Sequence, residues 1–391
     1  MILKHATLLL VVLGITWLGF QFCACETGSS GYEQGHVATQ RIQGSIRSGR
    51  NSKWIETVVD LKRRETMIDI QFPEASSGWI AGGSTVFRTS DGGKTWSSNE
   101  VSSQTSIRSY LDGISFLPSA LGWAATGTRL SPLQYRTDQM WINHTSDGGK
   151  TWENQFAKYG SQISRLRFIS SGEGWAVGRT RITNETIEDR PLILRTTDGG
   201  KTWIDLSEKF AGLNDFTVDV YAFDSSTAIV LTRMGQLFRT SDGGQTWKAT
   251  SFSREEQTPV GMLRVGASDD KKLWVLEGTD GREGMWTTLA LQRDGQEWVE
   301  YTTPSVYLKD VMFLSSQEVV ACGSIANSQP TPSFDDRRDG VILHSTNGGR
   351  DWEILHRATG VSSINKLSAV SPGLVWAVGE HGLVLRFQYS P

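Results

Sequence analysis

Cysteine is scarce in this chain of 391 residues, which contains three. Cys23 and Cys25 close an N-terminal apolar segment, so Cys322 alone would remain after removal of that segment. A single cysteine on a predicted strand cannot build a disulfide framework and behaves as a small apolar side chain when buried. An excess of positive charge is also lacking, because 39 basic and 42 acidic residues give a formal net charge of −3. This balance predicts no nucleic-acid partner.

The N-terminal segment has the pattern of an export signal. Lys4 and His5 precede an apolar run over residues 6–22, which is typical of a secretory signal peptide. We therefore expect a signal segment over residues 1–25, with Cys25 as a candidate for lipidation; simple cleavage and an uncleaved anchor are the alternatives. Residues 26–52 are rich in Gly, Ser and Gln without apolar periodicity, which predicts a flexible tether.

One nonapeptide, RTSDGGKTW, dominates the rest of the chain. Near-copies occupy residues 88–96, 144–152, 195–203, 239–247 and 344–352, and a degenerate copy lies at 293–298. The copies recur at intervals of roughly fifty residues, a period that indicates a repeat architecture.

The chemistry of this motif, the Asp-box, predicts a structural role. An aspartate before two glycines between β-rich runs is typical of a hairpin turn, because the aspartate caps the turn backbone and glycine accepts positive φ. The following tryptophan is expected to plug the interior of the repeat. Repetition of one turn implies a shared structural task, which disfavours a catalytic or metal-binding carboxylate. The residues expected in this role are Asp91, Trp96, Asp147, Trp152, Asp198, Trp203, Asp242, Trp247, Asn347 and Trp352.

A second motif, Gly-Trp followed by small apolar residues, predicts the number of repeats. Clear copies begin at Gly78, Gly122 and Gly174, and weaker ones bring the total to seven. An alternating apolar stretch precedes most of them, so each repeat is expected to hold four strands, here called A to D in chain order. Four-stranded units repeated radially are β-propeller blades. The last repeat lacks strand D, whereas residues 54–59 form an orphan strand, so we expect an all-β, seven-bladed propeller over residues 53–391, closed by its N-terminal strand.

The long connections between strands B and C are the candidate binding surface. Residues 128–140, 179–191 and 324–340 are expected on the face opposite the Asp-boxes, and loops on a rigid scaffold commonly carry function. Arginine is enriched at protein interfaces. The arginines expected to bind a partner are Arg63, Arg64, Arg129, Arg136, Arg179, Arg181, Arg190, Arg233, Arg282, Arg337 and Arg338. The alternative is a solvated rim in which Glu188, Asp189, Asp335 and Asp336 neutralise these arginines.

Charged residues at the inner strands are the candidates for catalysis. The inward positions are expected to be Asp69, Gly113, Arg165, Val220, Arg264, Asp310 and Lys366, with Asp112 and Asp219 one step earlier. A carboxylate pair could support glycoside chemistry, but mixed charges around a propeller axis also form an ordinary solvated lining. We favour the lining and expect no catalytic residue, no metal and no cofactor.

The signal segment, the seven repeats, the SDGGKTW turns and the Gly-Trp strands together resemble the photosystem II stability/assembly factor family of cyanobacteria and chloroplasts, over roughly residues 54–391. This resemblance implies a non-enzymatic lumenal or periplasmic chaperone that holds a membrane-protein precursor through an arginine patch. The stretch 231–240 resembles the family's Arg-Gly-aromatic segment, which identifies Arg233 as a candidate, although Met234 separates it from Gly235. The three long B–C connections depart from the compact family pattern.

The resulting hypothesis is an exported, monomeric, non-enzymatic propeller that binds a protein client and assists assembly of a membrane complex. Its expected location is the periplasm, the thylakoid lumen or an extracytoplasmic membrane surface, reached through a possible lipid anchor. One alternative is a secreted glycoside hydrolase of the sialidase or xyloglucanase-like Asp-box class. However, the Arg-Ile-Pro motif of sialidases is missing, sialidases have six blades, and xyloglucanases usually carry two propellers. A receptor-like propeller that binds peptides is the other alternative, since a fold does not settle function.

Overall fold

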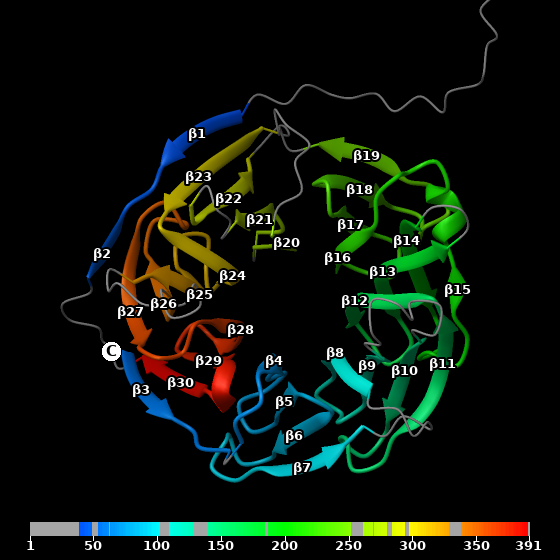
Figure 1. Cartoon of the computed structure of the whole chain (residues 1–391), viewed down its shortest axis with the longest axis horizontal. Helices are drawn as coiled ribbons and strands as arrows, with labels where there is room; N and C mark the ends of the chain where they lie inside the picture. The colour runs from blue at the N-terminus through cyan, green and yellow to red at the C-terminus, as the bar shows by residue number, and fades with distance from the viewer. Residues whose placement is uncertain are drawn as a thin grey trace, which may run out of the picture. The chain divides into compact units, whose positions relative to one another are not determined.

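Seven β-sheets follow one another around a ring (Figure 1). The computed structural model describes residues 39–48, 54–61, 63–101, 109–128, 139–183, 187–251, 261–268, 270–279, 284–293, 297–327 and 338–389. The predicted signal segment with Cys25, and the candidates Arg129, Arg136, Arg282 and Arg337, lie outside these residues. Everything described below belongs to one unit of the chain, Gln34–Pro391.

Each sheet is one blade, with its strands paired in the order A to D. Blade 1 contains β4 (Met67–Gln71), β5 (Gly78–Gly82), β6 (Thr85–Thr89) and β7 (Ser97–Glu100). Blade 2 contains β8 (Ser109–Phe116), β9 (Gly122–Thr128), β10 (Gln139–Thr145) and β11 (Glu153–Tyr159). Blade 3 contains β12 (Ser161–Phe168), β13 (Gly174–Thr183), β14 (Ile187–Thr196) and β15 (Ile204–Asp205).

The second half of the ring repeats this order. Blade 4 contains β16 (Thr217–Ala222), β17 (Ala228–Thr232), β18 (Gln236–Thr240) and β19 (Lys248–Ser251), preceded by the 3-10 turn η2 (Ser207–Phe210). Blade 5 contains β20 (Met262–Ala267), β21 (Leu273–Thr279), β22 (Trp286–Gln292) and β23 (Trp298–Pro304). Blade 6 contains β24 (Val306–Phe313), β25 (Val319–Ala326), β26 (Arg338–Ser345) and β27 (Trp352–Ala358). Blade 7 contains β28 (Ile364–Ser371), β29 (Leu374–Gly379), the 3-10 turn η5 (Glu380–Gly382) and β30 (Val384–Tyr389).

The N-terminal strand closes the ring, as the sequence predicts. Strand β3 (Trp54–Val58) pairs antiparallel with β30 and supplies the outer strand of blade 7. On the inside of the same seam, the Trp376 ring of blade 7 stacks on the Phe72 ring of blade 1, with centroids 4.3 Å apart. Closure pairs the first and last blades and removes the edge that an open array would expose.

Packing between blades explains the Gly-Trp motif. Trp123 of blade 2 is 1% exposed and stacks on Phe168 of blade 3, with ring centroids 3.5 Å apart. Phe168 in turn covers Gly174 of its own blade, where an added Cβ would collide with the ring. Glycine therefore makes room for the phenylalanine of strand A, and tryptophan carries the contact to the next blade.

The predicted tether over residues 26–52 is wrong for its last part. Strands β1 (Thr39–Gln43) and β2 (Ile46–Ser48) pair parallel with β23 and β27 and add a fifth strand to blades 5 and 6. An outer edge strand is held mainly through its main chain, so it requires few apolar side chains. The side-chain anchors are an Arg41–Glu300 ion pair at 2.9 Å and a hydrogen bond of 2.7 Å from Ser45 Oγ to Asp351.

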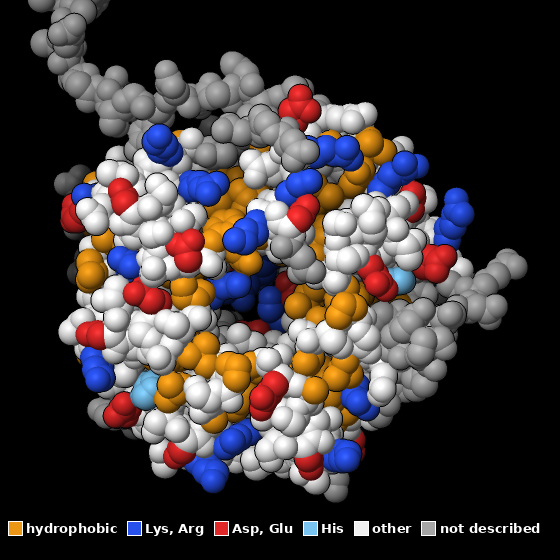
Figure 2. All heavy atoms as spheres, turned by 180° about the vertical axis from the view of Figure 1, so that it is seen from behind, with side chains coloured by type: hydrophobic (Ala, Val, Ile, Leu, Met, Phe, Trp, Pro, Cys, Tyr) orange, Lys and Arg blue, Asp and Glu red, His pale blue; other side chains and the backbone are white. Residues whose placement is uncertain are grey.

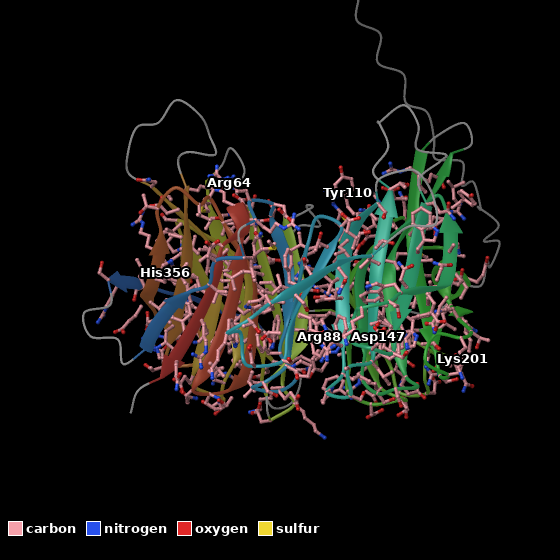
Figure 3. All side chains as sticks on the ribbon, turned by 90° about the horizontal axis from the view of Figure 1, so that it is seen from below. Arg64, Arg88, Tyr110, Asp147, Lys201 and His356 are labelled. Atoms are coloured by element: carbon pink, nitrogen blue, oxygen red, sulfur yellow. The ribbon has the colours of Figure 1, made fainter. Side chains whose placement is uncertain are left out.

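The two faces of the ring carry different connections (Figure 3). Asp147 and Lys201, which belong to Asp-box turns, lie on one face, and Arg64 and Tyr110 lie on the other. We call these the Asp-box face and the arginine face. The B–C connection of blade 3, expected to be a loop over 179–191, is a strand extension on the arginine face, since β13 and β14 stay paired as far as Thr183 and Ile187. Among the described residues, no helix is long and apolar enough to cross a membrane.

Candidate functional site

The Asp-box turns are closed hydrogen-bond networks. Asp147 Oδ1 accepts hydrogen bonds from the backbone N–H groups of Lys150 and Thr151, and Oδ2 accepts one from the Thr151 hydroxyl. Thr145 Oγ donates to Asp147 and accepts from the N–H of Gly149, whose φ of 92° favours glycine. In the other turns, the threonine equivalent to Thr151 donates hydrogen bonds to the aspartate. These bonds hold the pKa of Asp91, Asp198 and Asp242 at about 2. Both oxygens of the carboxylate therefore bind the turn itself, which supports the structural role.

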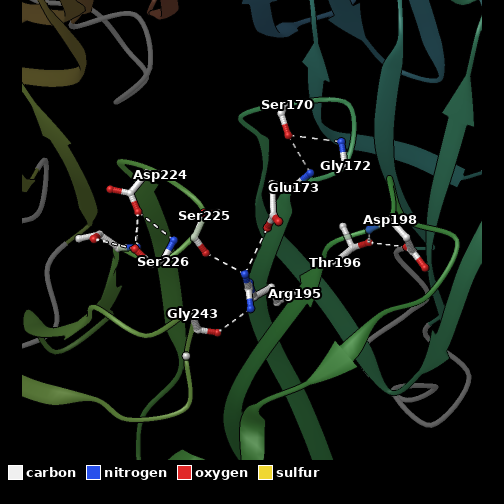
Figure 4. A network of polar contacts seen from close by, with 12 residues as sticks. Ser170, Gly172, Glu173, Arg195, Thr196, Asp198, Asp224, Ser225, Ser226 and Gly243 are labelled. Carbon is white, nitrogen blue, oxygen red and sulfur yellow. Dashed lines mark hydrogen bonds and ion pairs between the residues drawn. The ribbon is translucent and has the colours of Figure 1, made fainter.

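The same turns join neighbouring blades. Arg88 of blade 1 donates from Nη1 to the carbonyl oxygen of Asp147 in blade 2, at 2.9 Å. Arg195 of blade 3 repeats the contact on the Gly243 carbonyl of blade 4 and also binds Glu173 and the Ser225 carbonyl (Figure 4). In these two copies the first residue of the motif fastens one blade to the next, whereas His144 and His344 bind glutamates of their own blades.

The tryptophans of the Asp-boxes lie less deep than expected. Trp96, Trp152, Trp203 and Trp247 are half-buried, and Trp352 is buried, with 2% exposure. Trp203 packs edge-on against Phe168, with centroids 5.8 Å apart. The blade interior is already filled by the tryptophans of the Gly-Trp motif, so the Asp-box tryptophans cover that core from outside.

On the arginine face, blade 3 neutralises most of its own arginines. Arg179 and Arg181 both bind Asp189, at 2.9 and 2.8 Å, and Arg190 binds Glu188 at 3.1 Å. Burial raises the pKa of Asp189, whereas the two guanidinium groups lower it. The guanidinium groups outweigh burial, so the pKa of Asp189 is lower than its ordinary value. In blade 3, the contacts therefore fit the alternative stated above, in which acidic residues of the same connection neutralise the arginines.

Arg233 of blade 4 is an arginine on this face that a partner can reach. Its side chain is exposed and makes no ion pair with any residue that the structure describes. Arg233 and Arg179 each lie over the Phe216 ring, with the guanidinium carbon 5.6 Å from the centroid. The turn is fixed, because Arg233 N–H donates to Phe216 O and Met234 N–H donates to Asp215.

A pocket of about 300 Å³ opens beside this arginine. Its lining is Ser164, Phe216, Val218, Arg233, Gly261, Leu263 and Arg264. The pocket combines apolar walls with two guanidinium groups, a composition typical of binding sites. Phe216 and Arg264 were not among the sequence candidates for binding, because they come from the start of blade 4 and from an inner strand.

The remaining described candidates do not join this cluster. Arg63 and Arg64 are exposed on the connection between blades 7 and 1, and Arg63 lies over the Phe87 ring. Arg338 begins β26 in blade 6 and is half-buried. The structure therefore brings together Arg179, Arg181 and Arg233 around Asp189 and Phe216. Arg190 pairs with Glu188 instead, and the other described candidates lie elsewhere on the rim.

The inner strands line a central cavity of about 380 Å³ with alternating charges. Around the ring, one residue per blade occupies the same level: Asp69, Gly113, Arg165, Asp219, Arg264, Asp310 and Lys366. Positive and negative residues cannot alternate around a ring of seven positions without a gap. The uncharged Gly113 of blade 2 occupies that gap. The expected Val220 is wrong by one residue, because Asp219 pairs with Leu231 at the position where Arg165 pairs with Val177 in blade 3.

The three aspartates of this ring act as links between strands. Asp219 binds Arg165 at 2.9 Å and also accepts a hydrogen bond from the Val265 N–H of the next blade. Asp69 accepts from the Ile114 N–H, and Asp310 from the Leu367 N–H. Carboxylates used in this way support the interpretation as a structural lining rather than as acid–base pairs.

Comparison with known proteins gives the family. A family model described as photosynthesis system II assembly factor YCF48 matches residues 47–129 and 137–263. The photosystem II assembly lipoprotein Ycf48 of Synechococcus sp. (strain CC9902) is 22% identical over 237 residues, which cover 60% of this chain and 62% of that relative.

Solved structures give the same fold. A structure of YCF48 bound to D1 peptide has a TM-score of 0.62 at 20% identity and covers 88% of this chain and 100% of that chain. YCF48 from Cyanidioschyzon merolae has a TM-score of 0.61 at 18% identity, with 85% and 98% covered. The family model and the Synechococcus relative are both named for photosystem II assembly. Because the family model matches more than half of its residues, this chain belongs to the photosynthesis system II assembly factor YCF48 family.

Proposed function

We propose that this chain is an exported, non-catalytic assembly factor that holds a photosystem II client protein on its arginine face. The observation that carries the proposal is the family match over more than half of the chain. The relative solved with a D1 peptide supports a peptide segment of a photosystem II subunit as the client.

Arg233 is the proposed centre of the client site. Its exposed guanidinium stands beside a pocket with an aromatic wall, and exposed arginine next to aromatic surface is typical of interaction hot spots. A planar guanidinium can donate two parallel hydrogen bonds to a client carboxylate, or donate to a main-chain carbonyl oxygen. Arg179, already bound to Asp189, then serves to hold Phe216 and contributes less charge.

Attachment to the membrane completes the proposal. The relative from Synechococcus is named a lipoprotein, which supports lipidation of Cys25 after export, and a location at an extracytoplasmic membrane surface. We further propose that residues 1–25 form the signal segment and that the propeller acts as a monomer.

Affinity purification from the native host tests the function. The tagged chain is solubilised from membranes, and co-eluting proteins are measured by quantitative mass spectrometry. We expect photosystem II subunits with the unchanged chain and a loss of roughly tenfold or more with Arg233→Ala, since a hot-spot side chain contributes about 2 kcal/mol.

Arg239→Ala is the matched control. Arg239 lies in the same blade, is exposed, and lies over the Phe223 ring at 5.9 Å, but it belongs to the Asp-box turn on the opposite face. Equal losses with both variants would show that general charge and not the arginine face captures the client. A preparation without photosystem subunits would refute the proposed function.

A further inference from the structure

The charges in the central cavity do not all find partners. Arg165 binds Asp219 at 2.9 Å, and Lys366 binds Asp310 at 3.0 Å. Arg264 of blade 5 lies between these two pairs in the ring, and both neighbouring aspartates are already bound to another cation. Within the described part of the chain, no carboxylate forms an ion pair with Arg264.

The guanidinium of Arg264 is poorly satisfied as a hydrogen-bond donor. Its Nε is buried and has no hydrogen-bond partner among the described residues, and Nη1 reaches the Leu263 carbonyl at 3.4 Å. A buried donor without a partner costs free energy, so each such group in a native protein calls for an explanation. A bound ligand that accepts hydrogen bonds from Arg264 supplies one.

The electrostatics of the cavity favour a single negative charge. Four basic residues (Arg165, Arg167, Arg264 and Lys366) and three aspartates line it, which leaves one positive charge in excess. Burial and the neighbouring Arg165 lower the pKa of Arg264, although the three aspartates act in the opposite direction. An anion beside Arg264 would relieve this unfavourable environment.

The approach from the Asp-box face is apolar. Strand A runs from the arginine face to the Asp-box face, so Tyr221, Met312 and Phe313 lie beyond the charged ring on the Asp-box side, together with Trp274. Figure 2 shows this face, with Lys and Arg side chains deep in the central hollow and hydrophobic side chains around it. Arg167 lies over the Tyr221 ring at 4.3 Å and forms part of the same wall.

We propose that the central cavity binds a small monocarboxylate with an apolar body, whose carboxylate receives hydrogen bonds from Arg264 and whose body lies among Tyr221, Trp274, Met312 and Phe313. The planar guanidinium fork matches a carboxylate, and a few polar groups within apolar walls are typical of small-molecule sites. This site opens on the Asp-box face. Arg264 also lines the arginine-face pocket, but Tyr221, Trp274, Met312 and Phe313 line the central cavity and not that pocket.

Isothermal titration calorimetry of the purified full chain tests the site with phenylacetate as the probe. Phenylacetamide has the same body without the charge, and phenyl phosphate carries a different anion. We expect saturable, one-to-one binding of phenylacetate, at least tenfold weaker binding of the amide, and weaker binding of phenyl phosphate. Absence of saturation, equal affinity for the amide, or tighter binding of phenyl phosphate would overturn the proposal.

Two variants locate the ligand. Arg264→Lys keeps the charge between Asp219 and Asp310 but loses the planar fork, and should weaken phenylacetate binding at least tenfold while the thermal transition stays near that of the unchanged chain. Arg233→Ala alters the arginine-face pocket and not the cavity lining, so it should leave the affinity unchanged. Because Arg264 lines both pockets, a comparable loss of affinity with Arg233→Ala would place the ligand in the arginine-face pocket and overturn the proposal.

Discussion

Replacing Trp123 with alanine removes a buried, stacked contact between blades 2 and 3. The indole is 1% exposed, stacks on Phe168, and donates from Nε1 to the Gly199 carbonyl of blade 3 at 3.0 Å. A buried tryptophan removes up to about 250 Å² from water, and apolar area contributes about 25 cal/mol per Å². Alanine retains part of this contribution and the site relaxes, so we expect a loss of about 4 kcal/mol in the free energy of unfolding.

Trp203→Ala is the matched comparison. Trp203 packs against the same Phe168 ring but is half-buried, and its Nε1 has no partner among the described residues. Roughly half of the area is at stake, so the expected loss is about 2 kcal/mol. Equilibrium unfolding in urea measures both values, provided that the slope with denaturant stays the same for both variants.

The comparison separates two accounts of the repeat. If the core lies at the Gly-Trp strands, Trp123→Ala must be the more damaging change. If Trp203→Ala costs as much or more, the Asp-box tryptophan is the principal interior side chain and the packing described above is wrong. Trp123→Phe, which keeps a ring but loses the hydrogen bond to Gly199, should fall between wild type and Trp123→Ala.

Three further predictions concern the turns, the cavity and the N-terminal strands. Because hydrogen bonds lower the pKa of Asp91, Asp198 and Asp242 from about 4 to about 2, their stabilisation is complete above pH 4 and is lost as the pH falls towards 2. Thermal melts should show a decline in this window that Asp242→Asn makes smaller, and an unchanged pH profile would contradict the assignment. Asp219→Asn leaves Arg165 buried without its carboxylate and should cost about 3–5 kcal/mol in urea unfolding; a cost below 1 kcal/mol would show that the cavity is well solvated. Deletion of residues 39–48 uncovers the outer edges of β23 and β27 and should keep the circular dichroism spectrum while promoting association in light scattering, whereas a monodisperse product with an unchanged melting point would show that the two strands contribute nothing.

Much of the architecture can be predicted from the sequence because the Asp-box and Gly-Trp motifs recur in it. The Gly-Trp copies give seven blades, the orphan strand at residues 54–59 gives the ring closure, and the position of the Asp-box between strands C and D gives its face. Each of these inferences rests on a short local pattern that several blades share. The pairing of β3 with β30 and the separation of Asp147 from Arg64 agree with them.

The features that sequence could not supply depend on register or on main-chain pairing. The residue of β16 at the level of the charged ring is Asp219 and not Val220, and no composition signal sets this register. Strands β1 and β2 pair through their backbones at an exposed edge, so their polar sequence resembles a tether.

The sequence predicted arginines at the candidate site but not which of them are paired with carboxylates. Arginines on the B–C connections were expected, yet the neutralisation of Arg179 and Arg181 by one carboxylate, Asp189, depends on strand pairing. The contact of Arg233 with Phe216 joins two segments of blade 4 whose proximity only the folded ring establishes.

Site-specific photo-crosslinking tests the central claim, that the arginine face holds the client, most directly. A benzophenone amino acid is placed at Tyr110 on the arginine face, where the side chain is 40% exposed, or at Lys201 on the Asp-box face. The two variants are irradiated in membranes of the native host, and adducts are identified by mass spectrometry. The account predicts adducts with photosystem II subunits from position 110 and none from position 201. Adducts from position 201 alone would place the client on the opposite face and contradict it.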